Sequence, residues 1–386
     1  MTDVAIGIMS GTSGDGLDSA LVELDRETGR TRAIAHQHIP FAADLRRRIL
    51  AVASGDATAA ADLARLHAAL GDAYAEAALA LTLGAPSRPD VIGLHGQTVA
   101  HLPAGGVTLQ IGDAARVAVR TGIATVCDFR SADIAAGGEG APLTPFADHV
   151  LFSRRAPCVV LNLGGIANAT LLPDADADHV TGLDTGPGNI VIDAVARMSG
   201  HERDEGGAGA TRGRVLDGAL ASALAHPYFA RPAPKSTGRE DFGEDFARRL
   251  AEQVRAAGGS LDDALATATE LTARTVADAV ARATPKGTAW REVLVAGGGA
   301  ANAALVSALG RALAPVPVRA TDDVGIPAGA REAIAFAILA VYRLHGLPNT
   351  LPRVTGARHA VSAGAIHHPW QGGTAPLPPP ARNVPP

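Results

Sequence analysis

Glycines, hydroxyls and carboxylates are concentrated in one short segment near the start of the sequence. It follows the apolar run Val4–Met9 and consists of Gly11, Thr12, Ser13, Gly14, Asp15, Gly16, Leu17 and Asp18. Glycines allow backbone N–H groups to approach phosphate oxygens, and Asp15 or Asp18 could hold a metal ion through water. A Walker loop needs a lysine and a following helix, whereas this segment has no lysine and leads into a second strand. The pattern predicts a different kind of phosphate loop, with an ordinary hairpin turn as the alternative.

Asp184 is the best candidate for a general base. It lies in the segment Leu183–Asn189, between a short strand and a helical pattern from Ile190 to Met198. A carboxylate at a strand end can accept a proton from water or a hydroxyl, and the neighbouring glycines leave room for a substrate. The alternative is that Asp184 caps the turn that follows it.

Arg130 is a candidate for binding an anion. It follows the strand Ile123–Cys127 and precedes a glycine-rich loop, and its planar guanidinium could clamp a carboxylate or a phosphate. The alternative is a surface ion pair with Asp128 or Asp133.

Two histidines and two glycine turns complete the set of candidate residues. His95 and His101 fit no common zinc spacing, so substrate hydrogen bonding or packing is expected of them. Gly164–Gly165 and Gly297–Gly299 each follow an apolar strand, and they fit either a turn that a nucleotide approaches or a simple connection.

The elements that must position these residues alternate between strands and helices. Apolar residues recur with helical spacing from Ala61 to Leu83, and further helices are predicted from about Asn302 to Leu313 and from about Arg331 to His345. Such alternation indicates an α/β protein. Each half contains one strand, glycine turn and strand, so the sequence predicts two related lobes. The segment after about Trp370 is rich in proline and glycine, which predicts a disordered tail.

Composition excludes several classes of function. The chain has 386 residues, a length that suggests two domains, and a net charge of −5, which offers no basic surface for nucleic acid. Val4–Met9 is too short for a signal or membrane segment, so a soluble, unexported protein is expected. Cys127 and Cys158 are expected to be buried thiols.

Taken together, these segments resemble the anhydro-N-acetylmuramic acid kinase family, which shares its fold with sugar kinases, actin and the heat-shock chaperone ATPases. The resemblance covers nearly the whole chain. Its motifs are Met9–Asp18, His95–Thr98, Leu109–Asp113, Asp128–Arg130, Gly140–Leu143, Asn162–Asn168, Asp184–Asn189, Lys235–Glu240, Gly297–Gly299 and Glu332–Ala333. Gly14 departs from the family pattern, in which a larger apolar residue is expected.

The resemblance implies two ribonuclease H-like, actin-like lobes with an interdomain cleft that closes on its ligands. It implies ATP and Mg²⁺ as cofactors, with Mg²⁺ on the ATP phosphates and in water-mediated contact with Asp15. Asp184 would activate a water that opens the 1,6-anhydro bridge of anhydro-N-acetylmuramic acid, and the released oxygen would attack the γ-phosphate. The product would be N-acetylmuramic acid 6-phosphate, in cytoplasmic recycling of cell-wall sugar.

The resemblance also implies roles for particular residues. On the ATP side, besides the segment Gly11–Asp18, it implies Gly164, Gly165, Asn168, Gly297, Gly298 and Gly299. On the sugar side it implies Gln97, Thr98, His101, Arg130, Gly186, Pro187, Gly188 and Glu332.

The expected division is a first lobe of residues 1–133 plus about 346–370, a second lobe of residues 134–345 and a tail of residues 371–386. The resemblance implies a small amino sugar as the partner, nucleic acid and membrane are not expected as partners, and the sequence leaves a homodimer open. A kinase for another sugar and a non-catalytic nucleotide-switch ATPase are the alternative functions.

Overall fold

The first sheet has six strands, which the computed structural model forms from both ends of the chain. The structure describes residues 1–11, 14–232 and 235–369, so Thr12, Ser13 and the predicted tail lie outside the described residues. The strands are β1 (Thr2–Met9), β2 (Gly16–Asp25), β3 (Arg30–Pro40), β4 (Val91–Leu94), β7 (Ala124–Cys127) and β13 (Ala365–His367). Their order is β13-β7-β4-β1-β2-β3. The first three strands pair antiparallel, β4 and β7 run parallel to β1, and β13 pairs antiparallel with β7.

The second sheet repeats this arrangement. Its strands are β8 (Cys158–Leu163), β9 (Ile166–Leu172), β10 (Thr181–Pro187), β11 (Glu292–Ala296) and β12 (Val318–Ala320). The order is β10-β9-β8-β11-β12, with two antiparallel pairs followed by two parallel ones. This matches β3-β2-β1-β4-β7 strand for strand. The predicted α/β class with two related lobes is therefore confirmed.

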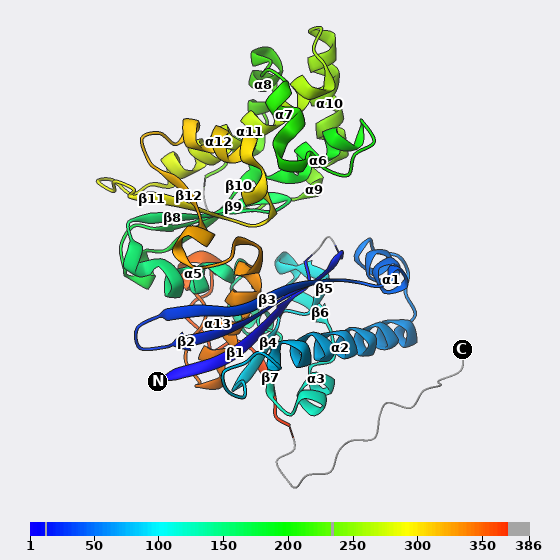
Figure 1. Cartoon of the computed structure of the whole chain (residues 1–386), viewed down its shortest axis with the longest axis vertical. Coiled ribbons are helices and arrows are strands. Elements are labelled where there is room, and N and C mark those ends of the chain that lie inside the picture. The colour runs from blue at the N-terminus through cyan, green and yellow to red at the C-terminus, as the bar shows by residue number, and fades with distance from the viewer. Residues whose placement is uncertain (12–13, 233–234, 370–386) are drawn as a thin grey trace.

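Two groups of helices cover the first sheet on opposite faces (Figure 1). One face packs on α2 (Ala60–Thr82) and α3 (Ala114–Thr121), and the apolar stripe of α2 that the sequence predicts is buried at Leu66, Leu70, Tyr74, Ala77 and Leu81. The other face packs on α5 (Thr144–Phe152) and α13 (Arg331–Leu344), which also contact β8 and β11 of the second sheet. A single apolar core therefore joins the two lobes.

Helix α13 comes unusually close to the first sheet. A Cβ atom on Gly7 of β1 would lie 1.8 Å from the Ala333 carbonyl oxygen, and one on Gly93 of β4 would lie 2.1 Å from that of Phe336. Only glycine at these two positions permits the approach. The expected division placed residues 331–345 in the second lobe, but this packing joins the helix to the first sheet.

The remaining helices lie over the far side of the second sheet or at the edges of the first (Figure 1). The longest, α11 (Leu261–Ala283), begins at a capping box in which the Ser260 hydroxyl accepts from the Asp263 N–H and the Asp263 carboxylate accepts from the Ser260 N–H. The others over this sheet are α6 (Asn189–Arg197), α7 (Ala208–Arg212), α8 (Asp217–Leu224), α9 (Arg239–Phe242), α10 (Glu244–Ala256) and α12 (Ala303–Ala312). Beside the first sheet are α1 (Ala43–Ala53), α4 (Ser131–Ala135) and the two-stranded ribbon of β5 (Gln97–Leu102) and β6 (Val107–Ile111), whereas α14 (Pro352–Thr355) packs against β10 of the second sheet.

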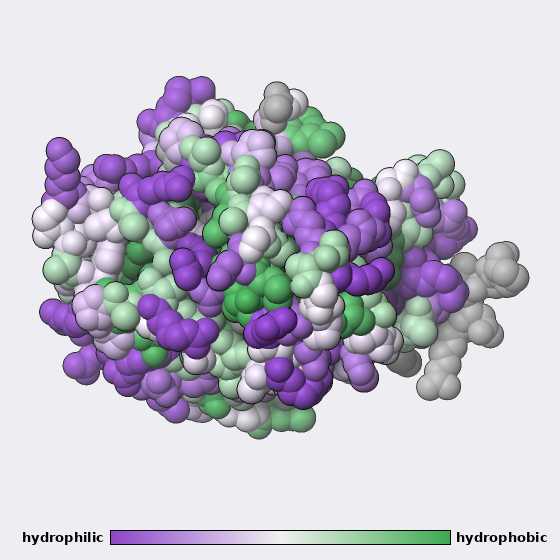
Figure 2. All heavy atoms as spheres, turned by 90° about the horizontal axis from the view of Figure 1, so that it is seen from above, coloured by the Kyte–Doolittle hydropathy of each residue, from purple (hydrophilic) through white to green (hydrophobic). Residues whose placement is uncertain are grey.

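The surface is of mixed polarity. Seen from the top of Figure 1, hydrophilic residues are spread over the molecule, with hydrophobic residues in small groups between them (Figure 2). No helix within the described ranges combines the length and the apolar run that crossing a bilayer requires. Cys127 and Cys158 are both free thiols, and Cys158 is buried as predicted, whereas Cys127 is only half-buried.

Candidate functional site

The predicted phosphate loop is the turn between β1 and β2, and the side chain of Gln97 holds it. The Ser10 hydroxyl donates to Gln97 Oε1, and Gln97 Nε2 donates to the Gly11 carbonyl at 3.2 Å. Gly14 has φ = +59°, close to side-chain atoms of Ile49, so the left-handed backbone accounts for glycine at this position. Leu17 is buried in the core under α2, so only its backbone is available to a ligand.

Asp18 and His38 face each other across β2 and β3. The two residues are paired in register, and His38 Nδ1 lies 2.8 Å from Asp18 Oδ1. Asp18 therefore stands at the edge of the loop with one oxygen engaged. His38 is not among the residues that the sequence analysis singles out, because its contact with Asp18 depends on the register in which β2 and β3 pair.

Arg130 is half-buried and has no carboxylate in direct contact. It donates to the Gly140 carbonyl at 2.8 Å, and its Nη2 lies 2.8 Å from His95 Nε2. Burial and the charge of Arg130 lower the pKa of His95 to about 3, so this imidazole is neutral and accepts the hydrogen bond. Burial lowers the pKa of Arg130 to about 10. Its Nε has no partner among the described residues.

The surface ion pair considered for Arg130 is not formed. Asp133 is fully buried and accepts instead from the Gly140 N–H at 2.9 Å and the Thr355 hydroxyl at 2.7 Å. Asp128 accepts from the Ser131 hydroxyl at 2.6 Å. Both carboxylates therefore fix the loop around Arg130 and leave its charge uncompensated by direct contact.

The β5–β6 ribbon places one predicted sugar-side residue, His101, near Arg130. Burial and the charge of Arg130 lower the pKa of His101, which puts the two side chains within electrostatic reach. His101 Nδ1 lies 3.1 Å from Thr108 Oγ1, and Thr98 Oγ1 accepts weakly from Gln110 at 3.4 Å. Gln97, Thr98 and His101 therefore lie on one strand that leads from the phosphate loop toward Arg130.

Glu332, in the first turn of α13, is where the two lobes meet. Asn162 Nδ2, at the end of β8, donates to Glu332 Oε1 at 3.3 Å. Burial raises the pKa of Glu332, and the charge of Asp18 adds to this effect, while Arg331 and Arg130 oppose it. The structure thus brings Glu332, Asp18 and Arg130 close enough to influence one another. Asn162 entered the sequence analysis only as part of a motif.

A row of polar residues leads from Glu332 to Asp184 across the second sheet. Asn162 pairs with Asn168, and Asn168 pairs with Asp184, in neighbouring strands. Residues directly opposite each other point to the same face of a sheet. Two strand spacings separate Asn162 from Asp184, or about 10 Å. Asp184 therefore shares the sheet face on which Asn162 reaches Glu332.

Asp184 is held from a distant part of the chain. Its Oδ2 accepts from the Thr237 N–H at 3.1 Å, and its carbonyl accepts from the Tyr228 hydroxyl at 2.8 Å. The alternative, a cap on the turn that follows Asp184, is not what this side chain does. Burial raises the pKa of Asp184 to about 6, and Glu240 adds to this effect, while the Thr237 N–H and the charge of Lys235 oppose it. Such a pKa suits a carboxylate that accepts protons near neutral pH.

The glycine turns of the second lobe pack against one another. The Gly164 carbonyl accepts from the Asn189 N–H and that of Gly165 from the Gly188 N–H, both at 2.8 Å. A Cβ atom on Gly299 would lie 2.6 Å from the Leu163 Cβ, so the 297–299 turn lies against the end of β8. Gly298 faces open space, and it could be approached by a ligand. Gly186 and Pro187 lie beyond an irregularity in β10 that follows Asp184.

The fold and the site together indicate the class of protein to which the chain belongs. Two sheets with the same strand order, each with a glycine-bearing first hairpin, are the arrangement of the two-lobed, actin-like ATPases. A profile of the anhydro-N-acetylmuramic acid kinase family matches residues 3–369. The chain belongs to the anhydro-N-acetylmuramic acid kinase family.

Individual relatives agree along the whole length. Anhydro-N-acetylmuramic acid kinase of Gloeobacter violaceus is 44% identical over 377 residues, covering 94% of this chain and 98% of the relative. The enzymes of Salinibacter ruber and Vibrio parahaemolyticus are each 42% identical, covering 94% and 95% of this chain and 96% and 98% of their own. Among solved structures, the activator of 2-hydroxyisocaproyl-CoA dehydratase from Clostridium difficile has a TM-score of 0.44 at 14% identity, covering 87% of this chain and 94% of its own.

Proposed function

We propose that this chain is an ATP-dependent kinase that hydrolytically opens 1,6-anhydro-N-acetylmuramic acid and phosphorylates it to N-acetylmuramic acid 6-phosphate. Membership of the family supports the activity. The observation that carries the choice of sugar is Arg130, because a desolvated cation with no carboxylate in direct contact is costly unless a ligand supplies one. The lactyl carboxylate of the sugar is such a group. The reaction belongs to cytoplasmic recycling of cell-wall sugar.

Asp184 is the general base in this proposal. It takes a proton from a water molecule whose oxygen bonds to the anomeric carbon, and the bond from that carbon to the bridging oxygen breaks. The freed oxygen on the sixth carbon bonds to the γ-phosphorus, and the bond to the β-phosphate oxygen breaks to give ADP. The raised pKa of Asp184 supports this role, because a base that titrates near 6 is deprotonated yet effective at neutral pH.

The phosphates of ATP are assigned to the β1–β2 turn and its adenosine to the second lobe. The backbone of 11–18 supplies N–H groups, and Gly164, Gly165, Asn168 and Gly297–Gly299 form the opposite wall. Packing of the two glycine turns at the end of β8 supports this assignment, because it leaves Gly298 open.

Mg²⁺ fits the charges on the first-lobe side. Asp18 raises the pKa of Glu332, so two carboxylates act on the same space, and a divalent cation would offset them together with the phosphates. We assign Mg²⁺ to the ATP phosphates, with Asp15 in contact through water. When bound, it neutralises charge that develops on the transferred phosphoryl group.

The sugar is assigned to the space between the β5–β6 ribbon and β10. Gln97, Thr98, His101 and Arg130 approach it from the first lobe, and Gly186, Pro187, Gly188 and Glu332 from the other side. The electrostatic link between Arg130 and His101, and that between Arg130 and Glu332, support a common site for these residues.

Isotope labelling tests the reaction. We expect the purified protein, with ATP, Mg²⁺ and 1,6-anhydro-N-acetylmuramic acid in ¹⁸O-water, to give the 6-phosphate with one ¹⁸O at the anomeric carbon. Mass spectrometry of the product, after brief reaction to limit exchange of the free hydroxyl, reads the label. An unlabelled 6-phosphate would disprove hydrolytic opening, and turnover of neutral hexoses alone would point to a kinase for another sugar.

A further inference from the structure

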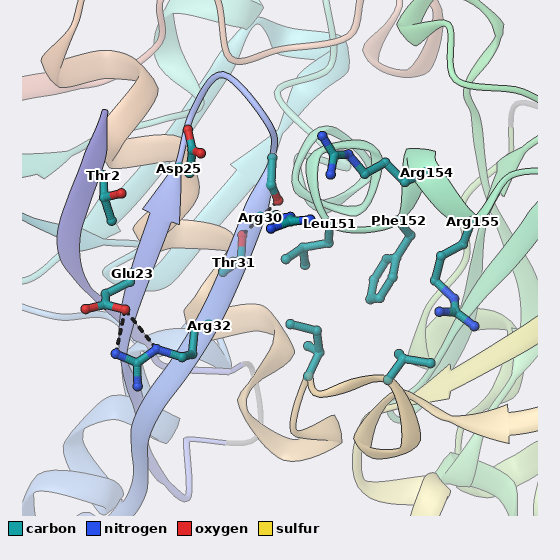
Figure 3. A pocket seen from close by; sticks show the side chains of 13 residues that line it. Thr2, Glu23, Asp25, Arg30, Thr31, Arg32, Leu151, Phe152, Arg154 and Arg155 are labelled. Atoms are coloured by element: carbon teal, nitrogen blue, oxygen red, sulfur yellow. Dashed lines mark hydrogen bonds and ion pairs between the residues drawn. The ribbon is translucent and has the colours of Figure 1, made fainter.

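A groove lies between the two lobes, away from every residue assigned above. It has a volume of about 590 Å³. One wall comes from β1–β3 of the first sheet and the other from the end of α5 and the 3₁₀ turn Ser153–Arg155 that follows it (Figure 3). Leu151, Phe152, Val324 and Ile326 supply apolar surface. A concave, partly apolar site of this size is typical of small-molecule binding.

The groove is far from the predicted phosphate loop. Thr2 and Asp25, which line it, are paired at one end of the β1–β2 hairpin, and Met9 and Asp18 are paired at the other. Seven residues of extended strand separate the two ends, which corresponds to about 23 Å. A ligand of this groove would therefore not occupy the ATP or sugar site.

Four arginines line the groove, and two of them lack charged partners. Arg32 pairs with Glu23, and Arg155 donates from Nε to Glu292 at 2.7 Å. The side chains of Arg30 and Arg154 form neither hydrogen bonds nor ion pairs with any residue that the structure describes. They extend from opposite walls of the groove (Figure 3).

The remaining acidic side chain does not neutralise them. Asp25 lies 3.7 Å from the N-terminal amine of Met1 and accepts from the Glu27 N–H. In a chain whose net charge is −5, two unpaired guanidinium groups beside an apolar floor form a local excess of positive charge. Planar guanidinium forks match phosphate oxygens well.

We propose that this groove binds a small phosphate-bearing molecule, with Arg30 and Arg154 as its charge partners. Because one arginine comes from β3 and the other from the segment joining α5 to β8, a bound phosphate contacts both lobes at once. Thr2 and Thr31, which also line the groove, add hydroxyl groups on the first-lobe side.

Calorimetry with inorganic pyrophosphate tests the site. The titration is run with saturating ADP, so that the phosphate loop is occupied. We expect saturable binding below about 1 mM, and at least about tenfold weaker binding in the double variant Arg30→Gln/Arg154→Gln. Arg255→Gln is the matched control, since the side chain of this exposed arginine of α10 also has no partner among the described residues and lies outside the groove. No saturable binding, or equal binding by the double variant, would overturn the proposal.

Hydrogen exchange of the unaltered protein is a second test of the groove site, and it does not depend on the folding of a variant. Pyrophosphate should slow exchange in residues 28–32 and 151–155, and protection confined to other segments would also overturn the site. Without pyrophosphate, the double variant should turn over sugar and ATP like the parent and keep its sedimentation behaviour. Loss of the groove site and failure of the proposed kinase reaction are thus separate results.

Discussion

Two arginines, the fully buried Arg331 and the half-buried Arg130, lie in very different surroundings. Arg331 in α13 donates to Asp148 of α5 through Nε at 2.8 Å and through Nη2, and the Thr170 hydroxyl donates to the same carboxylate at 2.6 Å. Arg130, in contrast, contacts a neutral imidazole and a carbonyl. Arg331 thus has a direct ion pair inside the protein, and Arg130 does not.

This difference separates the scaffold from the site. The Arg331–Asp148 pair joins α13 to α5 and thereby fixes Glu332, the next residue along α13. Arg130 and Asp184 are each held by neighbours that form no ion pair with the side chain. Burial lowers the pKa of Arg130 and raises that of Asp184, so in both cases it favours the neutral form. Such poorly compensated charges lower the stability of the protein, and they are typical of sites where a ligand supplies the missing partner.

The largest effect is expected from breaking the balanced pair. Asp148→Ala leaves Arg331 buried and unpaired, which should lower the free energy of unfolding by about 3–5 kcal/mol. Urea denaturation followed by circular dichroism measures the change. Asp62→Ala, which removes the partner of Arg65 on the surface of α2, should change stability little. Equal losses in the two variants would contradict the distinction.

Asp184→Asn should produce the next largest effect, on catalysis. The amide keeps the shape and the hydrogen bond from Thr237 but cannot take a proton, so turnover should fall at least about 100-fold while ATP binding is retained. Steady-state kinetics and calorimetry with ATP measure these two quantities. Because a poorly compensated buried charge is removed, thermal stability should not fall. Normal turnover would assign the base to another residue.

The features that the sequence predicted correctly depend on residues that lie close together along the chain. The buried stripe of α2 and the two strand, turn and strand units depend on local spacing, so both could be derived. The contacts that build the site depend on register. Asp184 is bound by Thr237, 53 residues later, and Asn162, Asn168 and Asp184 form a row only once three strands pair.

The packing of the helix predicted at Arg331–His345 could not be derived from the sequence either. The sequence shows that Arg331–His345 is a helix but not which sheet receives it. Gly7 and Gly93 make room for the backbone of this helix against the first sheet, and a single glycine in a strand has no such meaning until its neighbours are known. The burial of Arg130 is likewise a property of the folded loop around Asp133.

Arg130→Gln tests whether the unbalanced arginine is reserved for the sugar. Loss of a charged hydrogen bond should raise the KM for the anhydro sugar about 10- to 100-fold and leave the KM for ATP unchanged. The same anhydro sugar without its lactyl group is the matched control, since the parent protein should bind it as weakly as the variant does, and the variant should not distinguish the two sugars. Discrimination retained by the variant would place the carboxylate elsewhere. Unlike Asp148→Ala, this change should not reduce stability.

The pH dependence is the smallest effect. Asp184 must be deprotonated to act as a base, and burial raises its pKa to about 6, so kcat should fall as the pH decreases through 6, by about tenfold at pH 5. Phosphate groups also titrate near pH 6, so ATP alone would produce a similar profile. Asp184→Glu resolves the two causes, because it keeps ATP unchanged and places a different carboxyl group in the same pocket. An inflection that moves in this variant assigns the titration to residue 184, and an inflection at the same pH in both proteins assigns it to the nucleotide.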